Sequence, residues 1–90
     1  MKQYEVLIEP KAQKQLKKMD YIQAKSIIKW IEKNLVNCTN PYFSGKALKG
    51  NLKDYWRYRV GSYRLFTRID NEKIIITIVK IGHRQGVYDN

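Results

Sequence analysis

The alternation of apolar and polar residues in the first part of the chain predicts a strand followed by helices. In residues 2–9, apolar side chains alternate with polar ones, which is typical of a strand. Leu7 shares the side of Glu5, so we expect both faces of this strand to be partly covered.

Residues 11–36 carry apolar side chains at helical spacing, and we expect two helices joined as a hairpin. Pro10 suits the first turn of the first helix, where its missing N–H costs no hydrogen bond. Asp20 can cap the second helix, which residues 37–41 bring to an end. The apolar positions of the second helix recur at i, i+3, i+4, i+7 and i+11 and are Ala24, Ile27, Ile28, Ile31 and Leu35.

The second half of the chain predicts a loop at residues 43–54 and then three strands. Tyr55–Val60 and residues 62–69 alternate, and a tight Gly-Ser turn separates them. Residues 73–81 are almost continuously Ile and Val, as expected of a strand buried on both faces. The element order predicts an α+β fold with an N-terminal strand, a helical hairpin and a three-strand antiparallel meander, the hairpin being packed on one sheet face.

Length and composition predict one small folded domain over residues 1–90. Hydrophobic residues make up 43% and charged residues 29% of the 90 residues, which is ordinary for a globular chain. No apolar run is long enough to span a membrane, and the N-terminus has no apolar signal core. We therefore expect a cytoplasmic protein without a membrane partner. Cys38 is the only cysteine, which excludes an intramolecular disulfide and a thiolate metal cluster.

The charge of the chain points to a polyanionic partner. Eighteen Lys and Arg against eight Asp and Glu give a formal net charge of +10. The lysines of the two helices are expected to form an ordinary solvated surface. All the arginines come later in the sequence, and four of them have strand spacing that places them on the sheet face opposite the helices: Arg57, Arg59, Arg64 and Arg68.

This arginine face predicts a phosphate-binding surface, because a guanidinium binds phosphate oxygens in a bidentate way. Crowded like charges repel each other unless an anion lies among them. The alternative is that nearby carboxylates neutralise the arginines one by one. From Lys46 to Arg68, however, seven basic residues face one acid, Asp54.

The aromatic residues of this region have two possible uses. Tyr55 and Phe66 fall on the arginine side, where they could either stack on bases or pack. Core packing is the better interpretation for those on the apolar face, Trp56, Tyr58 and Tyr63.

His83, the only histidine, follows the last predicted strand, and we expect it next to the arginine face beside Arg84. Its imidazole can accept a proton near neutral pH. The sequence shows no spaced carboxylate pairs for a metal, no nucleophile triad and no phosphate-binding glycine loop. We therefore predict no metal and no cofactor. An enzyme of this kind acting on RNA would use the 2′-hydroxyl of the substrate as its nucleophile.

Three motifs in this order resemble the RelE/ParE superfamily of toxins from type II toxin–antitoxin pairs. They are residues 48–60 (LKGNLKDYWRYRV), residues 61–65 (GSYRL), and residues 81–84 (IGHR) followed by Val87 and Tyr88. The resemblance covers essentially the whole chain. It implies a ribosome-dependent endoribonuclease that cleaves messenger RNA in the ribosomal A site and is silenced by a cognate antitoxin. The antitoxin would cover either the helical hairpin or the arginine face.

The resemblance also implies roles for individual residues. Arg59, Arg64 and Arg84 would hold the scissile phosphate, His83 would move the proton, and Tyr88 would stack on or orient the substrate. Ribosomal RNA and messenger RNA would be bound by a further set of cations, Lys46, Lys49, Lys53, Arg57 and Arg68. The alternative is a ParE-like toxin that inhibits DNA gyrase and cuts no RNA, or a relative that has lost activity. The joint presence of Arg64, Arg84 and Tyr88 favours the nuclease.

Overall fold

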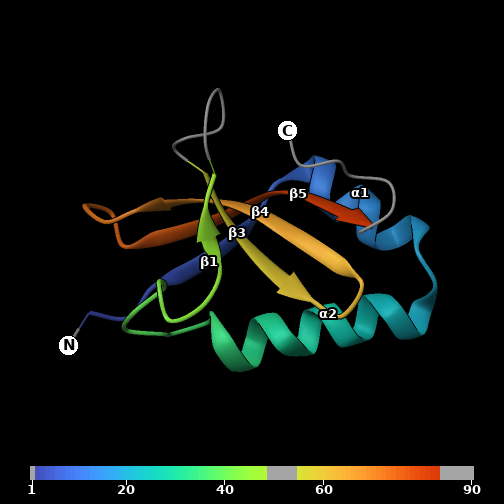
Figure 1. The fold of residues 1–90 in the computed structure, drawn as a ribbon, viewed down its shortest axis with the longest axis horizontal. Helices are drawn as coiled ribbons and strands as arrows, with labels where there is room; N and C mark the ends of the chain where they lie inside the picture. The colour runs from blue at the N-terminus through green and yellow to red at the C-terminus, as the bar shows by residue number, and fades with distance from the viewer. Residues whose placement is uncertain (1, 49–54, 84–90) are drawn as a thin grey trace.

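The computed structural model describes residues 2–48 and 55–83, and within them two helices and a mixed five-stranded sheet form an α+β fold (Figure 1). This confirms the fold class predicted from the sequence. The elements are β1 (Glu5–Ile8), α1 (Pro10–Lys18), α2 (Tyr21–Asn34), β2 (Lys46–Ala47), β3 (Tyr55–Val60), β4 (Tyr63–Asp70) and β5 (Ile75–His83).

The strands lie in the order β1-β5-β4-β3-β2, with β1 parallel to β5 and the other pairs antiparallel. The predicted meander is therefore confirmed. The short edge strand β2 is a correction, because residues 43–54 were expected to be a loop. A two-residue strand is too short to show alternation in the sequence. Its pairing with β3 forms through the tertiary fold, as in the hydrogen bond from Leu48 N to Tyr55 O at 3.1 Å.

Helix α1 begins at Pro10 as predicted and packs on β5. Ala12 is fully buried at this contact. The side chain of Gln15 adds a polar link, because its Oε1 accepts a hydrogen bond from the backbone N–H of Ile81 at 2.7 Å.

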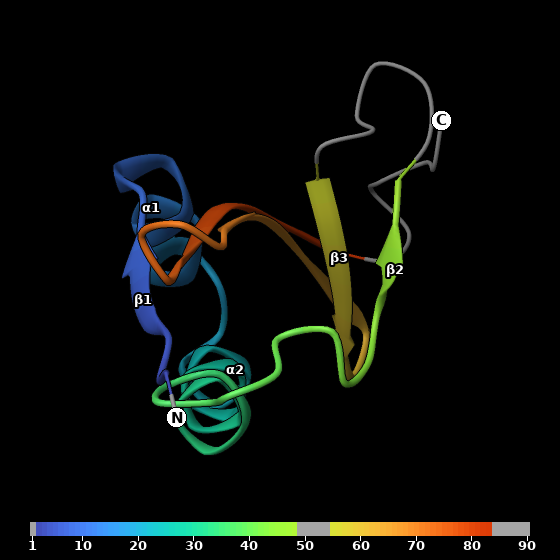
Figure 2. The ribbon, with the colours of Figure 1, turned by 90° about the vertical axis from the view of Figure 1, so that its left-hand side faces the viewer.

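Helix α2 begins as predicted, with Asp20 Oδ2 accepting a hydrogen bond from Ile22 N at 3.1 Å. The sheet curves around this helix, which Figure 2 shows end-on. Of the recurring apolar positions of this helix, Ile27, Ile31 and Leu35 are buried, whereas Ile28 is 40% exposed and lies outside the core. The buried stripe is rotated toward Trp30, whose ring lies 5.5 Å from the ring of Tyr58 on β3 and replaces Ile28 in the helix–sheet contact.

The core lies between the helices and one face of the sheet, as the alternation predicts. Tyr58 is fully buried, and its hydroxyl donates a hydrogen bond to the carbonyl of Pro41. Trp56 and Tyr63, also predicted for this face, are partly buried against the same core. The sheet side of the core is completed by fully or almost fully buried Leu65, Ile76, Ile78 and Ile81.

Two strands differ from their expected form. Strand β1 is shorter than residues 2–9, and Leu7 is 51% exposed, so the Glu5 side of this strand is more open than expected. Strand β5 runs to His83, and residues on its side away from the helices, such as Ile75 and Thr77, are only half-buried. Among the described residues, no helix combines the length and apolar character that crossing a membrane requires.

Candidate nucleic-acid interface

Two arginines lie side by side on the open sheet face, near the turn between β3 and β4. Arg59 on β3 lies directly opposite Arg64 on β4. Directly opposed residues of an antiparallel pair project to the same face, with Cβ atoms about 4.5–5.5 Å apart. Gly82 continues this row on β5 without adding a side chain. The row therefore presents two cationic side chains on one sheet face, an arrangement that attracts anions.

The burial of the pair differs between its members. Arg64 is only 8% exposed, whereas Arg59 is exposed to solvent. A buried guanidinium keeps its positive charge. The effective dielectric around it is lower than that of water, so its electrostatic interactions are stronger. The pair therefore combines a firmly placed charge on β4 with an accessible one on β3.

A second row lies next to the first and crosses four strands. It consists of Lys46 on β2, Arg57 on β3, Phe66 on β4 and Lys80 on β5. Phe66 is only 6% exposed, so it packs within the sheet face and is not available for base stacking. The Nζ atom of Lys80 lies 5.8 Å from the centre of the Phe66 ring, a favourable cation–π distance.

Lys80 was missed by the sequence analysis because a β-bulge decides which way it points. Lys80 pairs with Phe66 and Ile78 pairs with Thr67, so Val79 is an extra residue on β5. Without the bulge, strict alternation from the buried Ile78 would place Lys80 toward the helices. A bulge redirects side chains in this way. A run of Ile and Val residues around one lysine gives no indication of such a bulge in the sequence.

A pocket of about 240 Å³ opens beside these rows, where the segment before β2 meets β3. Its walls are Ser44, Gly45, Lys46, Arg57 and Arg59. The segment is held in place by a hydrogen bond from Trp56 Nε1 to Ser44 O at 2.8 Å. Gly45 is required by close packing, because a Cβ at this position would lie 2.4 Å from Arg57 O.

Arg68 lies on the same open face but at a distance from the other arginines. It follows Arg64 by four residues on β4, which separates their Cα atoms by about 14 Å. Its Nη2 donates a hydrogen bond to Glu9 Oε2 at 3.0 Å in an ion pair. Its guanidinium also lies 5.9 Å from the ring centre of Tyr55. The Tyr55 ring therefore already has an intramolecular contact. Arg68 is thus partly neutralised and does not join the cationic rows.

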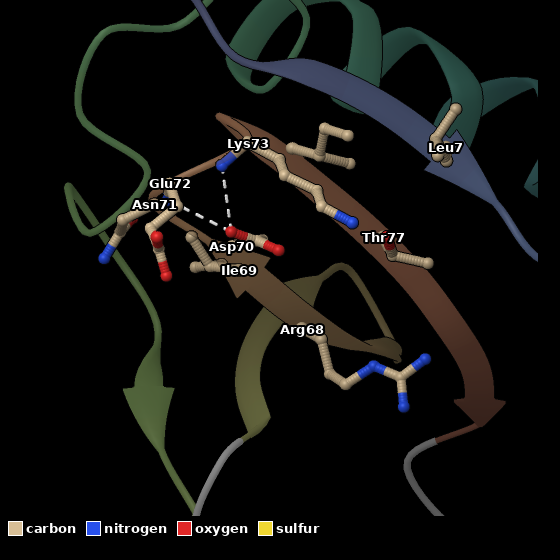
Figure 3. Close-up of a pocket in the computed structure, with 9 residues that line it drawn as sticks. Leu7, Arg68, Ile69, Asp70, Asn71, Glu72, Lys73 and Thr77 are labelled. Atoms are coloured by element: carbon tan, nitrogen blue, oxygen red, sulfur yellow. Dashed lines mark hydrogen bonds between the residues drawn. The ribbon is translucent and has the colours of Figure 1, made fainter.

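Figure 3 shows the surroundings of Arg68, a hollow of about 620 Å³ with a mixed lining. Exposed Leu7 and the partly buried Ile75 supply apolar surface, and acidic residues balance Arg68 and Lys73. The carboxylate of Asp70 accepts hydrogen bonds from the backbone N–H groups of Glu72 and Lys73 at 3.0 and 2.9 Å. This end of the face lacks the positive excess of the arginine rows.

The structure does not bring His83 onto the arginine face. His83 ends β5 as expected, but it pairs with Tyr63, and its ring meets the Tyr63 ring edge-on at 5.0 Å. Tyr63 belongs to the side of the sheet that packs on the helices. The expectation that His83 lies next to the arginines is therefore corrected, because the pleat turns it to the opposite side from Arg64.

The remaining predicted site residues lie outside the described residues. They are Lys49, Lys53, Arg84 and Tyr88. Cys38 lies near the core and away from the arginine rows, and burial raises the pKa of its thiol. A thiol with a raised pKa is a poor nucleophile at neutral pH.

Comparison with known families identifies the class of the protein. Residues 6–88 match the family described as "ParE toxin of type II toxin-antitoxin system, parDE". The chain belongs to this family, and thus to the RelE/ParE superfamily of type II toxins that its motifs resemble.

Individual relatives agree with this assignment. The chain is 38% identical over 48 residues to Toxin RelG of Mycobacterium tuberculosis, a match that spans 53% of this chain and 55% of that protein. The toxin–antitoxin complex RelBE2 of Mycobacterium tuberculosis contains a similar chain, with a TM-score of 0.83, 28% identity and coverage of 93% and 94%. The isolated E. coli RelE toxin has the same fold, with a TM-score of 0.69, 20% identity and coverage of 89% and 83%.

Proposed function

We propose that the protein is a ribosome-dependent endoribonuclease that cleaves messenger RNA in the ribosomal A site and so inhibits translation. The observation that supports the proposal is the cross-strand pair of Arg59 and Arg64, two cations on one sheet face that would bind one phosphate. The similarity to RelE toxin structures supports it. The formal net charge of +10 suits a partner made largely of RNA.

In the proposed reaction the substrate supplies its own nucleophile. The 2′-oxygen attacks the adjacent phosphorus, the bond from phosphorus to the 5′-oxygen breaks, and a 2′,3′-cyclic phosphate and a 5′-hydroxyl result. Negative charge grows on the phosphate oxygens as the new bond forms. Arg59 and Arg64 stabilise that charge, and removing one such group typically costs about 10²–10³ in rate.

Proton transfer needs a group other than the paired arginines, because a guanidinium remains protonated. We assign the 2′-hydroxyl proton to His83, which passes it on to the departing 5′-oxygen. His83 ends β5 one residue beyond Gly82, the partner of Arg64, and it faces the Tyr63 side of the sheet. The RNA would then bend over this end of the sheet. Arg84 is proposed to add a third phosphate contact and Tyr88 to orient the substrate.

The partner of the toxin is proposed to be an antitoxin that docks in a groove between the two helices. The groove has a volume of about 410 Å³, and apolar side chains line it between rows of lysines. An acidic amphipathic helix complements such a surface in both shape and charge. The lining residues are Leu16, Lys17, Tyr21, Ala24, Lys25, Ile28, Lys29 and Glu32.

Two substitutions on one helix test this docking site. Ile28→Asp places a charge inside the groove, and Ile22→Asp places the same charge on an exposed position that does not line it. We expect Ile28→Asp to weaken binding of the co-expressed antitoxin and Ile22→Asp to leave it unchanged, measured by calorimetry. Equal effects of the two variants would contradict the proposal.

The alternative function is inhibition of DNA gyrase, which the ParE description of the matched family favours. A cell-free translation reaction followed by primer extension on the message separates the two functions. Cuts at the A site of stalled ribosomes support the nuclease. An intact message with inhibited gyrase supercoiling supports the alternative, and an intact message with normal supercoiling indicates a relative without either activity.

A further inference from the structure

We propose that the row of Lys46, Arg57 and Lys80 binds a second phosphate of the substrate strand, next to the phosphate held by Arg59 and Arg64. This inference rests on the proposed function and extends it from the scissile linkage to the neighbouring nucleotide. It adds Lys80, whose position on this face comes from the bulge at Val79.

The spacing of the two rows suits neighbouring phosphates. Arg57 and Arg59 are two residues apart on β3, so the rows are separated by about 7 Å. Both rows lie on the same face of the sheet. An RNA strand that runs parallel to β3 and β4 would therefore meet one row and then the other.

The cationic side chains of the second row lie on either side of Phe66. Phe66 fills the centre of the row, and its ring holds the ammonium group of Lys80 at 5.8 Å. On the other side, Lys46 and Arg57 line the pocket of about 240 Å³ together with Arg59. Arg59 thus borders both phosphate positions.

The two lysines have charge to offer a ligand. Within residues 2–48 and 55–83, neither Lys46 nor Lys80 forms an ion pair with a carboxylate, in contrast to Arg68 with Glu9. Lys46 is exposed and Lys80 is half-buried, so a strand on this face can reach both. A bound phosphate would relieve the repulsion within the row.

The test measures how salt affects the binding of a strand that cannot be cleaved. A fluorescent single-stranded DNA oligonucleotide lacks the 2′-hydroxyl and is titrated with the full chain at several KCl concentrations. Each phosphate contact contributes about −0.7 to the slope of log K against log salt concentration. We expect Lys80→Gln to make the slope shallower by about 0.7 and to weaken binding to all sequences alike.

Three further variants keep the test decisive. Lys80→Arg retains the charge and should retain the wild-type slope. Lys46→Gln, on an exposed site that folding tolerates, should reproduce the effect of Lys80→Gln. Lys33→Gln removes the same charge from the last turn of α2, away from the sheet face, and should leave the slope unchanged.

A wild-type slope for both Lys80→Gln and Lys46→Gln, or an equal change in Lys33→Gln, would overturn the second phosphate site. The binding assay does not depend on cleavage. An intact message in the translation assay together with the expected slopes would therefore reject the nuclease and keep the binding site. Cleavage together with unchanged slopes would support the nuclease and reject the second phosphate site.

Discussion

Arg59 and Arg64 lie directly opposite each other across strands β3 and β4, close to the two-residue turn that joins these strands. The turn sets the register of the hairpin, so the two guanidinium groups share one face. Like charges at directly opposed positions destabilise a sheet. This arrangement is explained if the pair serves to bind an anion.

The arginine pair should be essential for cleavage. Arg59→Gln and Arg64→Gln should each lower the cleavage rate on programmed ribosomes by about 10²–10³, because each removes a charge that stabilises the transition state. Arg68→Gln is the matched control, since Arg68 is paired with Glu9 and lies away from the row. A rate for Arg68→Gln as low as that of the pair variants would contradict the proposed site. Circular dichroism checks that each variant is folded.

Gly45 should tolerate substitution less well than Gly61, although both have a positive φ, of 92° and 59°. In Gly61→Ala the new Cβ would have no atom within 4 Å. The substitution should lower the free energy of unfolding only by the penalty for a left-handed backbone, about 1–2 kcal/mol. Gly45→Ala should cost a further 1–3 kcal/mol or so, because its Cβ would collide with the Arg57 carbonyl. Urea unfolding measures both values, and equal losses would show that the contact is readily relaxed.

The ion pair between Glu9 and Arg68 should contribute little to stability. Both side chains are substantially exposed, so Glu9→Gln should lower the free energy of unfolding by less than about 1 kcal/mol. The difference from the wild type should shrink further in high salt, because exposed charges are screened. Denaturant unfolding at low and high KCl tests this, and a large effect that does not depend on salt would contradict it.

Tyr58 should couple stability to alkaline pH. Burial holds the pKa of its phenol above the ordinary value of 10.0. The folded protein therefore keeps the proton at a pH where the unfolded chain loses it. The contribution of Tyr58 is fully present below pH 10 and is lost as pH rises above it. Tyr4 acts in the same direction, because burial raises its pKa as well.

Tyr58→Phe should reduce this alkaline loss of stability. At neutral pH it should also lower the free energy of unfolding by about 1–3 kcal/mol, since the buried Pro41 carbonyl loses its hydrogen-bond donor. Tyr21→Phe is the control at an exposed tyrosine. Unfolding curves from pH 7 to 11 measure both effects. An alkaline profile identical to that of the wild type would show that Tyr58 does not account for the loss.

Local patterns in the sequence determined most of the fold. Alternation placed Tyr58 in the core and Arg57, Arg59 and Arg64 on the other face, because successive residues of a strand point to opposite sides. The hairpin register then followed from the short turn. The cap at Asp20 was also predictable from local sequence, because its hydrogen-bond partner Ile22 is only two residues away.

Only the tertiary structure decided how these faces are completed. The bulge that turns Lys80 outward depends on how β5 pairs with β4, and the position of His83 beside Tyr63 depends on the same register. The ion pair of Arg68 joins it to Glu9, 59 residues away in the sequence. Strand β2 exists because it pairs with β3. Short-range periodicity specifies the elements, whereas contacts between distant segments determine which charges meet and which are neutralised.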